Sequence, residues 1–195
     1  IHLCPPSPTI IDTINPIARA GYGVDLAISK AQTADYTSMV GGVVAENILI
    51  EGDTTRRDGL PKIYIMTNPV NERLSLHETI KRLEEVYNSM RSVAMPTFYM
   101  EDVGYQRAAI EEAQRHGLPA VPMRVGSDKR SRLRAAAIFI QNGTVVFPKK
   151  GAEDLIAQLC GFGIEEHDDL ADAFVHLVMG IRAGGMTMPD VIVLG

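Results

Sequence analysis

The sequence predicts an α/β domain built on a mixed β-sheet. A series of apolar, β-branched runs in the first third of the chain is typical of an antiparallel meander. Strand-like runs then alternate with amphipathic helices, as they do in βαβ units. The chain has 195 residues, of which 46% are hydrophobic and 22% are charged. That length suits one domain with a buried core.

The predicted meander follows an extended arm or linker over residues 1–20, which is rich in proline. In residues 22–29, apolar positions alternate with small or acidic ones, the period of two expected of a strand. Residues 36–46 form a second apolar run. A third strand is placed either at 47–51 or at 62–66.

Helices and strands are expected to alternate in the rest of the chain. Ser75 and Glu78 have the spacing of a capping box at the start of a helix, and Gly117 is placed to end another helix. The expected elements are a helix from Ser75 to about residue 90, a strand over 97–101, a helix over 105–116, a strand over 120–125, a helix over 128–141, a strand over 144–147, helices over 153–160 and 167–181, and a tail over 184–195 that contains a strand-like run at 191–194.

Two candidate functional carboxylates fall on predicted strands. Asp25 shares its strand face with Gly23 and Ala27, whose small side chains leave room for a substrate to approach. Glu101 ends a later strand, and ligands favour the carboxyl ends of strands in open α/β sheets. Alternation along the strand favours Glu101 over Asp102 as the inward residue. The alternatives are an Asp25 carboxylate bonded to a neighbouring amide and a Glu101–Asp102 pair that caps the next helix.

A second pair of carboxylates, Asp168 and Asp169, opens the last predicted helix, where the helix dipole favours ionised acids. Neither lies on the apolar stripe of that helix, so both can face a cleft; ordinary first-turn aspartates are the alternative. If this pair meets Asp25 and Glu101 at one sheet edge, the four offer the oxygen ligands that Mg²⁺ prefers. Two such ions about 3.5–4 Å apart can activate water and stabilise the leaving oxygen in phosphodiester cleavage.

The densest basic cluster lies in the first half of the helix expected over 128–141. It suits salt-dependent, sequence-independent contacts with DNA phosphates; a solvated helix face is the alternative. The net charge of −5 argues only mildly against a DNA partner, because part of it belongs to the candidate metal ligands. DNA binding is therefore expected to be weak, metal-assisted and salt-sensitive. The cluster consists of Lys129, Arg130, Arg132 and Arg134.

Five segments of the sequence, taken in order along the chain, indicate a similarity to a known protein family. They are Gly23-Val24-Asp25 with Asp35-Tyr36-Thr37, Glu101-Asp102-Val103-Gly104-Tyr105-Gln106, Asp128-Lys129 with Arg132 and Arg134, Gly143-Thr144-Val145-Val146-Phe147-Pro148, and His167-Asp168-Asp169-Leu170-Ala171-Asp172-Ala173. Together they resemble the C-terminal nuclease domain of the large terminase subunit of tailed bacteriophages. The resemblance covers about residues 21–181, which is most of the chain.

This resemblance implies a ribonuclease H-like fold over residues 21–183 and a metal-dependent endonuclease that cuts concatemeric viral DNA during genome packaging. It implies Mg²⁺ or Mn²⁺ as the cofactor, as two ions. By motif, Asp25 and Glu101 match the strand acids of the family, and Asp168 and Asp169 match its acidic pair; these four are the candidate catalytic and metal-binding residues. Weaker candidates for supporting roles are Asp102, His167, which can also cap the helix, and Asp35, which can also serve a turn.

The resemblance also implies partners. They are double-stranded DNA and, in the full-length protein, the portal, the small terminase subunit and an ATPase domain, all in the cytoplasm of the bacterial host. The sequence has no GxxxxGK[ST] phosphate loop, so no ATP site is expected in this chain. Because it also begins at Ile1, we expect an excised nuclease domain that is monomeric alone. No stretch of 18 apolar residues suggests a membrane span.

Other functions stay open at this stage. Another ribonuclease H-like nuclease, such as a junction resolvase or a transposase core, would use similar acids, and a non-catalytic docking domain would carry them for structural reasons only. A phosphohydrolase suggested by His167-Asp168 is disfavoured, because the other histidines form no ligand set. His176 follows Asp169 by two helical turns and either lines the same edge or lies on the surface.

Overall fold

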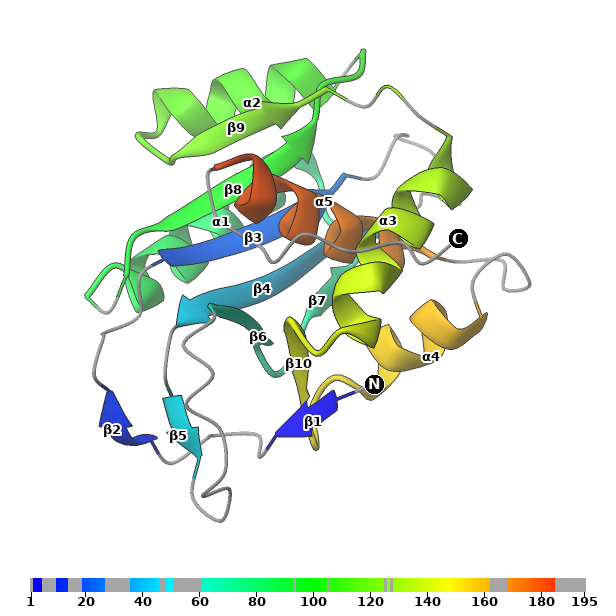
Figure 1. Ribbon diagram of the computed structural model, residues 1–195. Coiled ribbons are helices and arrows are strands. Elements are labelled where there is room, and N and C mark those ends of the chain that lie inside the picture. Colours follow the sequence, from blue (N-terminus) through cyan, green and yellow to red (C-terminus); the bar gives the residue numbers. More distant parts are fainter. Residues whose placement is uncertain are drawn as a thin grey trace.

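The computed structural model describes residues 2–4, 10–13, 19–26, 36–45, 48–50, 61–92, 94–104, 106–124, 126, 128–161 and 168–184. A mixed β-sheet forms the centre of the molecule and helices cover both of its faces (Figure 1). The predicted mixed α/β architecture is therefore confirmed. Asp35, His167 and the tail beyond residue 184 lie outside the described residues.

Eight strands make up the main sheet. They are β1 (His2–Cys4), β3 (Arg19–Asp25), β4 (Thr37–Ala45), β6 (Lys62–Ile65), β7 (Val70–Glu72), β8 (Pro96–Glu101), β9 (Ala120–Met123) and β10 (Val145–Pro148). Their order across the sheet is β1-β10-β6-β4-β3-β8-β9, and β7 pairs with β4 away from this path. β3 therefore lies near the middle, between an antiparallel neighbour, β4, and a parallel neighbour, β8.

The antiparallel meander is present as β3, β4 and β6. Both candidates for its third strand are strands, but only β6 pairs with β4. The other, β5 (Ile48–Ile50), pairs with β2 (Ile10–Thr13) in a separate two-stranded sheet. The segment expected to be an extended arm thus supplies β2, and it also supplies β1, which pairs with β10.

Five helices are described. Ser75 and Glu78 form the predicted capping box at the start of the first one, with each side chain bonded to the other residue's backbone N–H. Gly117 follows the second helix with a φ of 74°, a conformation that favours glycine. No helix among the described residues is long and apolar enough to cross a membrane. The helices are α1 (Leu76–Met90), α2 (Gln106–Arg115), α3 (Lys129–Gln141), α4 (Glu153–Gly161) and α5 (Asp169–Ala183).

The helices form two layers, one on each face of the sheet (Figure 1). α1 and α2 bury residues such as Leu83 and Ile110 against Val24 and Phe98 of the strands. α3, α4 and α5 pack on the opposite face, where α5 contributes the largest share of the buried apolar side chains. The two faces of β3 therefore belong to two separate cores.

α5 lies unusually close to the sheet, because glycines remove the side chains that would separate them. A Cβ atom built on Gly23 would lie 1.8 Å from the Ala173 carbonyl oxygen, and one built on Gly180 would lie 2.2 Å from the Tyr99 ring. Real Cβ atoms do not approach other atoms so closely. The glycines thus bring the backbone of α5 into contact with β3 and β8.

Candidate active site

Asp25 and Glu101 lie side by side at the carboxyl ends of two parallel strands. Val24 of β3 pairs with Met100 of β8, and Asp25 and Glu101 are the next residue on each strand. Gly23 faces α5, and alternation puts Asp25 on the same face. Tyr99 also faces α5, which puts Glu101 there too. The structure therefore brings the two predicted strand acids to one sheet edge, on the face that α5 covers.

Asp102 has a different environment. Its carboxylate accepts hydrogen bonds from Arg107 at the start of α2: from Nε to Oδ1 at 3.0 Å and from Nη2 to Oδ1 and Oδ2 at 2.8 and 3.0 Å. This pair joins the end of β8 to the next helix. The geometry agrees with the preference for Glu101 as the inward carboxylate.

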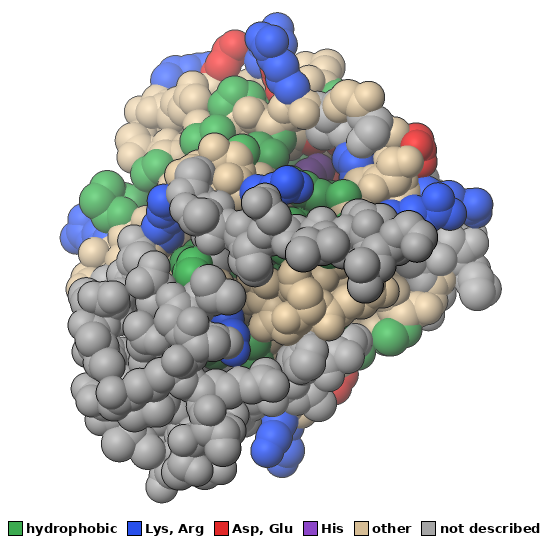
Figure 2. All heavy atoms as spheres, in the orientation of Figure 1, with side chains coloured by type: hydrophobic (Ala, Val, Ile, Leu, Met, Phe, Trp, Pro, Cys, Tyr) green, Lys and Arg blue, Asp and Glu red, His purple; other side chains and the backbone are tan. Residues whose placement is uncertain are grey.

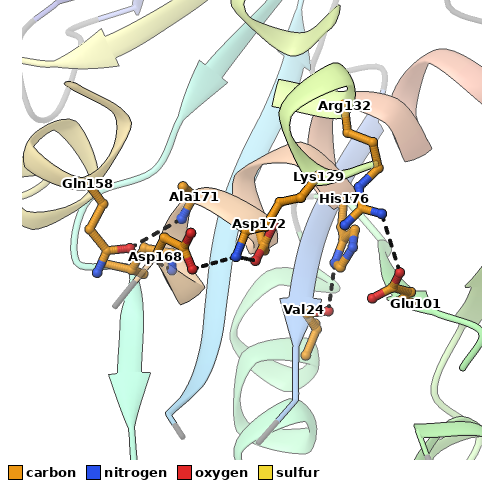
Figure 3. Close-up of polar contacts among 10 residues, drawn as sticks. Val24, Glu101, Lys129, Arg132, Gln158, Asp168, Ala171, Asp172 and His176 are labelled. Carbon is orange, nitrogen blue, oxygen red and sulfur yellow. Dashed lines mark hydrogen bonds and ion pairs between the residues drawn. The ribbon is translucent and has the colours of Figure 1, made fainter. Parts of the chain in front are cut away.

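The start of α5 is capped by a side chain from another helix. Gln158 of α4 is buried, and its Oε1 accepts hydrogen bonds from the Leu170 and Ala171 backbone N–H groups at 2.9 and 3.3 Å. Asp168 occupies the N-cap position but makes no side-chain cap hydrogen bond. The ordinary first-turn role considered for Asp168 is therefore filled by Gln158, and the Asp168 carboxylate points elsewhere (Figure 3).

Lys129 joins two acids at the start of α5 (Figure 3). Its ammonium donates to Asp168 Oδ1 at 2.5 Å and lies 2.5 Å from Asp172 Oδ2. The two acids are four positions apart, so they share one side of the helix. Asp172 is a candidate site residue that the sequence interpretation missed, although its spacing from Asp168 and Asp169 was an available signal.

The electrostatics of Asp25 show that these acids influence one another. Burial, followed by the charges of Asp172 and Asp169, raises the pKa of Asp25 to about 8; Glu101 adds to this rise and Lys129 opposes it. Negative charges repel a further ionised carboxylate, and a nearby cation favours it. We call Asp25, Glu101, Asp168, Asp169 and Asp172 the acid cluster. It combines residues from β3, β8 and the start of α5.

The predicted basic cluster is divided into two pairs by the geometry of α3. Lys129 and Arg132 point toward the acid cluster, and Arg132 Nη1 lies 3.6 Å from Glu101 Oε1 (Figure 3). Arg130 and Arg134, four positions apart, are exposed on the outer side of the helix. Basic side chains protrude on the side of the molecule where α3 lies (Figure 2). Of the four basic residues, Arg130 and Arg134 are therefore the two whose side chains are exposed to solvent.

His176 lies behind the acid cluster, between α5 and β3. It is 2% exposed, and its Nδ1 is 3.1 Å from the carbonyl oxygen of Val24, next to Asp25. A carbonyl can only accept, so Nδ1–H is the donor. Nε2 has no hydrogen-bond partner among the described residues. Burial lowers the pKa of His176, which favours the neutral ring. The surface alternative for His176 is wrong, because α5 packs directly on β3.

The chemistry of the acid cluster suits a divalent cation. Its donors are carboxylate oxygens, which Mg²⁺ and Mn²⁺ prefer. The pKa of Asp25 is raised by burial first and by the neighbouring negative charges second, and a cation would offset those charges. As placed, no three Asp, Glu, His or Cys side chains among the described residues converge closely enough to hold a metal ion. The Lys129 ammonium lies between two of the carboxylates instead.

Solved structures of large terminases and their nuclease domains share this architecture. The large terminase nuclease from thermophilic phage G20c is similar over 92% of this chain and 93% of that chain, with a TM-score of 0.57 and 17% identity. With bound magnesium, that nuclease gives a TM-score of 0.59 and 14% identity over 92% of each chain. The large terminase from a second thermophilic bacteriophage, in complex with ADP, gives 0.60 and 10% identity over 93% of this chain and 42% of its own.

These similarities concern the fold. No protein-family profile and no curated protein matches the sequence. The G20c nuclease has also been solved with bound zinc and with bound cobalt. The ribonuclease H-like fold expected from the sequence motifs is confirmed, and its structural neighbours are nucleases of the family that those motifs resemble.

Proposed function

We propose that this chain is a metal-dependent endonuclease that cuts concatemeric viral DNA during genome packaging. The observation that carries the proposal is the meeting of acids from β3, β8 and α5 at one edge of the sheet. Asp25 and Glu101 end neighbouring parallel strands, and Asp169 and Asp172 both raise the pKa of Asp25. The strand acids were candidates on sequence grounds alone.

The acid cluster would hold Mg²⁺ or Mn²⁺ through the carboxylates of Asp25, Glu101, Asp168, Asp169 and Asp172. A pair of such ions, when bound, supplies water activation and stabilisation of the leaving oxygen of the phosphodiester. The parallel strands fix the positions of Asp25 and Glu101, and the Gln158 cap fixes the first turn of α5. The fold itself thus positions these carboxylates, without any contact with DNA.

Basic side chains of α3 would hold the DNA. Arg130 and Arg134 are exposed and suit contacts with phosphate oxygens. Arg132 lies beside Glu101, where it can approach a phosphate close to the acid cluster. Contacts of this kind read no base, so the expected binding is sequence-independent and weakens with salt.

The structural neighbours support this proposal. The G20c nuclease carries magnesium, zinc or cobalt in its different structures, which favours a divalent metal here. The terminase of the second phage extends well beyond the matched region and is in complex with ADP. We propose, accordingly, that this nuclease works with an ATPase domain, a portal and a small terminase subunit on double-stranded DNA in the bacterial cytoplasm, and that the nuclease domain alone is monomeric.

A plasmid-nicking assay with Mn²⁺ tests the proposal. Asp25→Asn and Glu101→Gln keep the size of each side chain and remove its charge, and each should lower the rate by about 100-fold or more. Glu111→Gln removes one acid from the exposed side of α2 and serves as the matched control. Full activity in EDTA, or in Asp25→Asn, would overturn the proposal. Preferential cleavage of a four-way junction would point to a resolvase instead.

A further inference from the structure

We propose that Lys129 is the resident counter-ion of the acid cluster and competes with metal ions for Asp168 and Asp172, so that it sets the metal affinity of the site. This inference rests on the proposed metal-dependent function. It assigns to Lys129 a role in metal binding in place of the DNA-phosphate contact suggested by the sequence. Lys129 is a positioning and affinity-setting residue here, and it takes no part in the chemical step.

The geometry places one ammonium on two carboxylates. Lys129 Nζ lies 2.5 Å from Asp168 Oδ1 and 2.5 Å from Asp172 Oδ2. The Asp172 side chain is only 14% exposed and that of Asp168 is 25% exposed, so water screens these contacts incompletely. A divalent cation needs the same carboxylate oxygens. The ammonium and the metal ion therefore compete for the same ligands.

The contact between Lys129 and the two acids depends on how the first turns of α3 and α5 are capped. Asp128 caps α3, with its side chain accepting from Ser131 N–H at 3.1 Å. This places Lys129 in the first turn of α3. α3 and α5 pack on the same face of the sheet, and Gln158 leaves the Asp168 carboxylate available by capping α5 in its place. Lys129 thus reaches the acids from a helix held by independent contacts.

The electrostatic effect of Lys129 extends beyond the two acids it contacts. Its charge lowers the pKa of Asp25, whereas Asp172 and Asp169 raise it. Arg132 is less closely engaged, at 3.6 Å from Glu101. Lys129 is therefore a cation in direct contact with Asp168 and Asp172. A metal ion that enters meets repulsion from this charge in addition to competition for oxygen atoms.

A structural ion pair would predict the opposite outcome for metal binding. If Lys129 mainly held α3 against α5, its loss would loosen the acid cluster and weaken metal binding. If Lys129 is a competing counter-ion, its loss leaves repelling carboxylates that bind a divalent cation more tightly. Apolar contacts of Ala136 and Phe139 hold α3 in either case. The sign of the change in metal affinity therefore separates the two roles.

The test is titration calorimetry of Mn²⁺ into the metal-free protein without DNA. Lys129→Met keeps the length of the side chain and removes its charge, and Mn²⁺ should bind this variant on the order of tenfold more tightly. Lys129→Arg keeps the charge and should bind Mn²⁺ much as the wild type does. Lys81→Met makes the same change at an exposed position of α1, on the opposite face of the sheet, and is the matched control.

Thermal unfolding gives a second readout on the same proteins. In EDTA, Lys129→Met should unfold at a lower temperature than the wild type, because repulsion within the acid cluster is uncompensated. Added Mn²⁺ should raise its unfolding temperature by more than that of the wild type. A Lys129→Met protein that is folded in EDTA but binds Mn²⁺ equally or more weakly overturns the counter-ion role. If the wild type binds no Mn²⁺ at all, the proposed function fails instead.

Discussion

The two faces of β3 differ in the size and polarity of the side chains they carry. On the face toward α1 and α2, Tyr22 and Val24 are large and buried in an apolar core. On the face toward α5, Gly21 and Gly23 present no side chain, and Asp25 follows them at the carboxyl end of the strand. One face gains stability from apolar burial. The other gives up side-chain volume so that a helix bearing carboxylates can approach the strand.

This difference shows how a carboxylate cluster is assembled inside a stable sheet. Because the acids repel one another, apolar burial in other parts of the same elements must hold them together. The Leu177 and Ile181 side chains of α5 are buried in the core on that face, and they hold the helix whose first turns carry the acids. The α1 face contributes stability without contacting the acid cluster. Variants on the two faces should therefore have separable effects.

The largest effect is expected from Gly23→Ala. The new Cβ would meet the Ala173 carbonyl oxygen at 1.8 Å, so α5 must move away from β3. We expect a loss of about 3 kcal/mol or more in the free energy of unfolding and loss of Mn²⁺ binding, measured by denaturant unfolding and calorimetry. Gly126→Ala is the control, because its Cβ meets nothing within 4 Å. Normal Mn²⁺ binding by Gly23→Ala would show that the close approach is not needed.

The next effect concerns pH in EDTA. Folding raises the pKa of Asp25 from 3.8 to about 8, so between these values the folded protein binds more protons than the unfolded chain does. The stabilisation of the fold by Asp25 is fully present below the unfolded-state pKa and is lost as pH rises through the folded-state pKa. The wild type should lose several degrees of thermal stability from about pH 5 to about pH 9.

Asp25→Asn is the comparison that isolates this group. His116, whose pKa is raised by Glu84, also loses its contribution as pH rises, but it does so equally in both proteins. The difference between the two melting profiles should therefore grow with pH in favour of Asp25→Asn. Parallel profiles would show that folding does not raise the pKa of Asp25.

A smaller effect is expected from Gln158→Ala, which removes the cap of α5. The Leu170 and Ala171 N–H groups would lose a buried acceptor, at a cost of about 1–2 kcal/mol. Mn²⁺ affinity should fall as well, because a loosened first turn of α5 would displace the acids that it carries. Gln158→Glu keeps an acceptor oxygen at the same place and should restore most of the stability. A Gln158→Ala protein with unchanged stability would show that water replaces the cap.

The smallest effect is expected from Ile80→Val on the α1 face. Ile80 is 3% exposed and packs in the apolar core with Val24. Removing one methylene should cost about 1 kcal/mol by denaturant unfolding. Mn²⁺ affinity should not change. A marked change in Mn²⁺ affinity would show that the two faces of β3 are coupled.

Much of this architecture was predictable because it depends on local periodicity. Alternation of side chains placed Asp25 on the face of Gly23 and placed Glu101 on the inward face of β8. The capping box at Ser75 and Glu78 also needs only four consecutive residues. Such features follow from backbone geometry, so a single sequence contains them.

The features that were missed depend on contacts between distant segments. The spacing of Asp172 from Asp168 was a local signal for its place in the acid cluster, but no spacing within one helix reveals its contact with Lys129 of α3. Gln158 caps α5 from α4 across a gap in sequence. The burial of His176 follows from the packing of α5 on β3, where its Nδ1 lies 3.1 Å from the Val24 carbonyl oxygen. The assignment of catalytic roles to the acids stays a prediction.

The parallel pairing of β3 with β8 has a consequence for when the acid cluster forms during synthesis. Asp25 and Glu101 are brought together by a pairing between segments far apart in the chain, and the α5 acids are made later still. Structures dominated by such distant contacts form slowly, since long loops must close first. A nascent chain that lacks α5 would have the strand acids but not the rest of the cluster. The complete acid cluster should therefore form only after α5 has been synthesised and has docked, so the proposed nuclease activity would be absent from the incomplete chain.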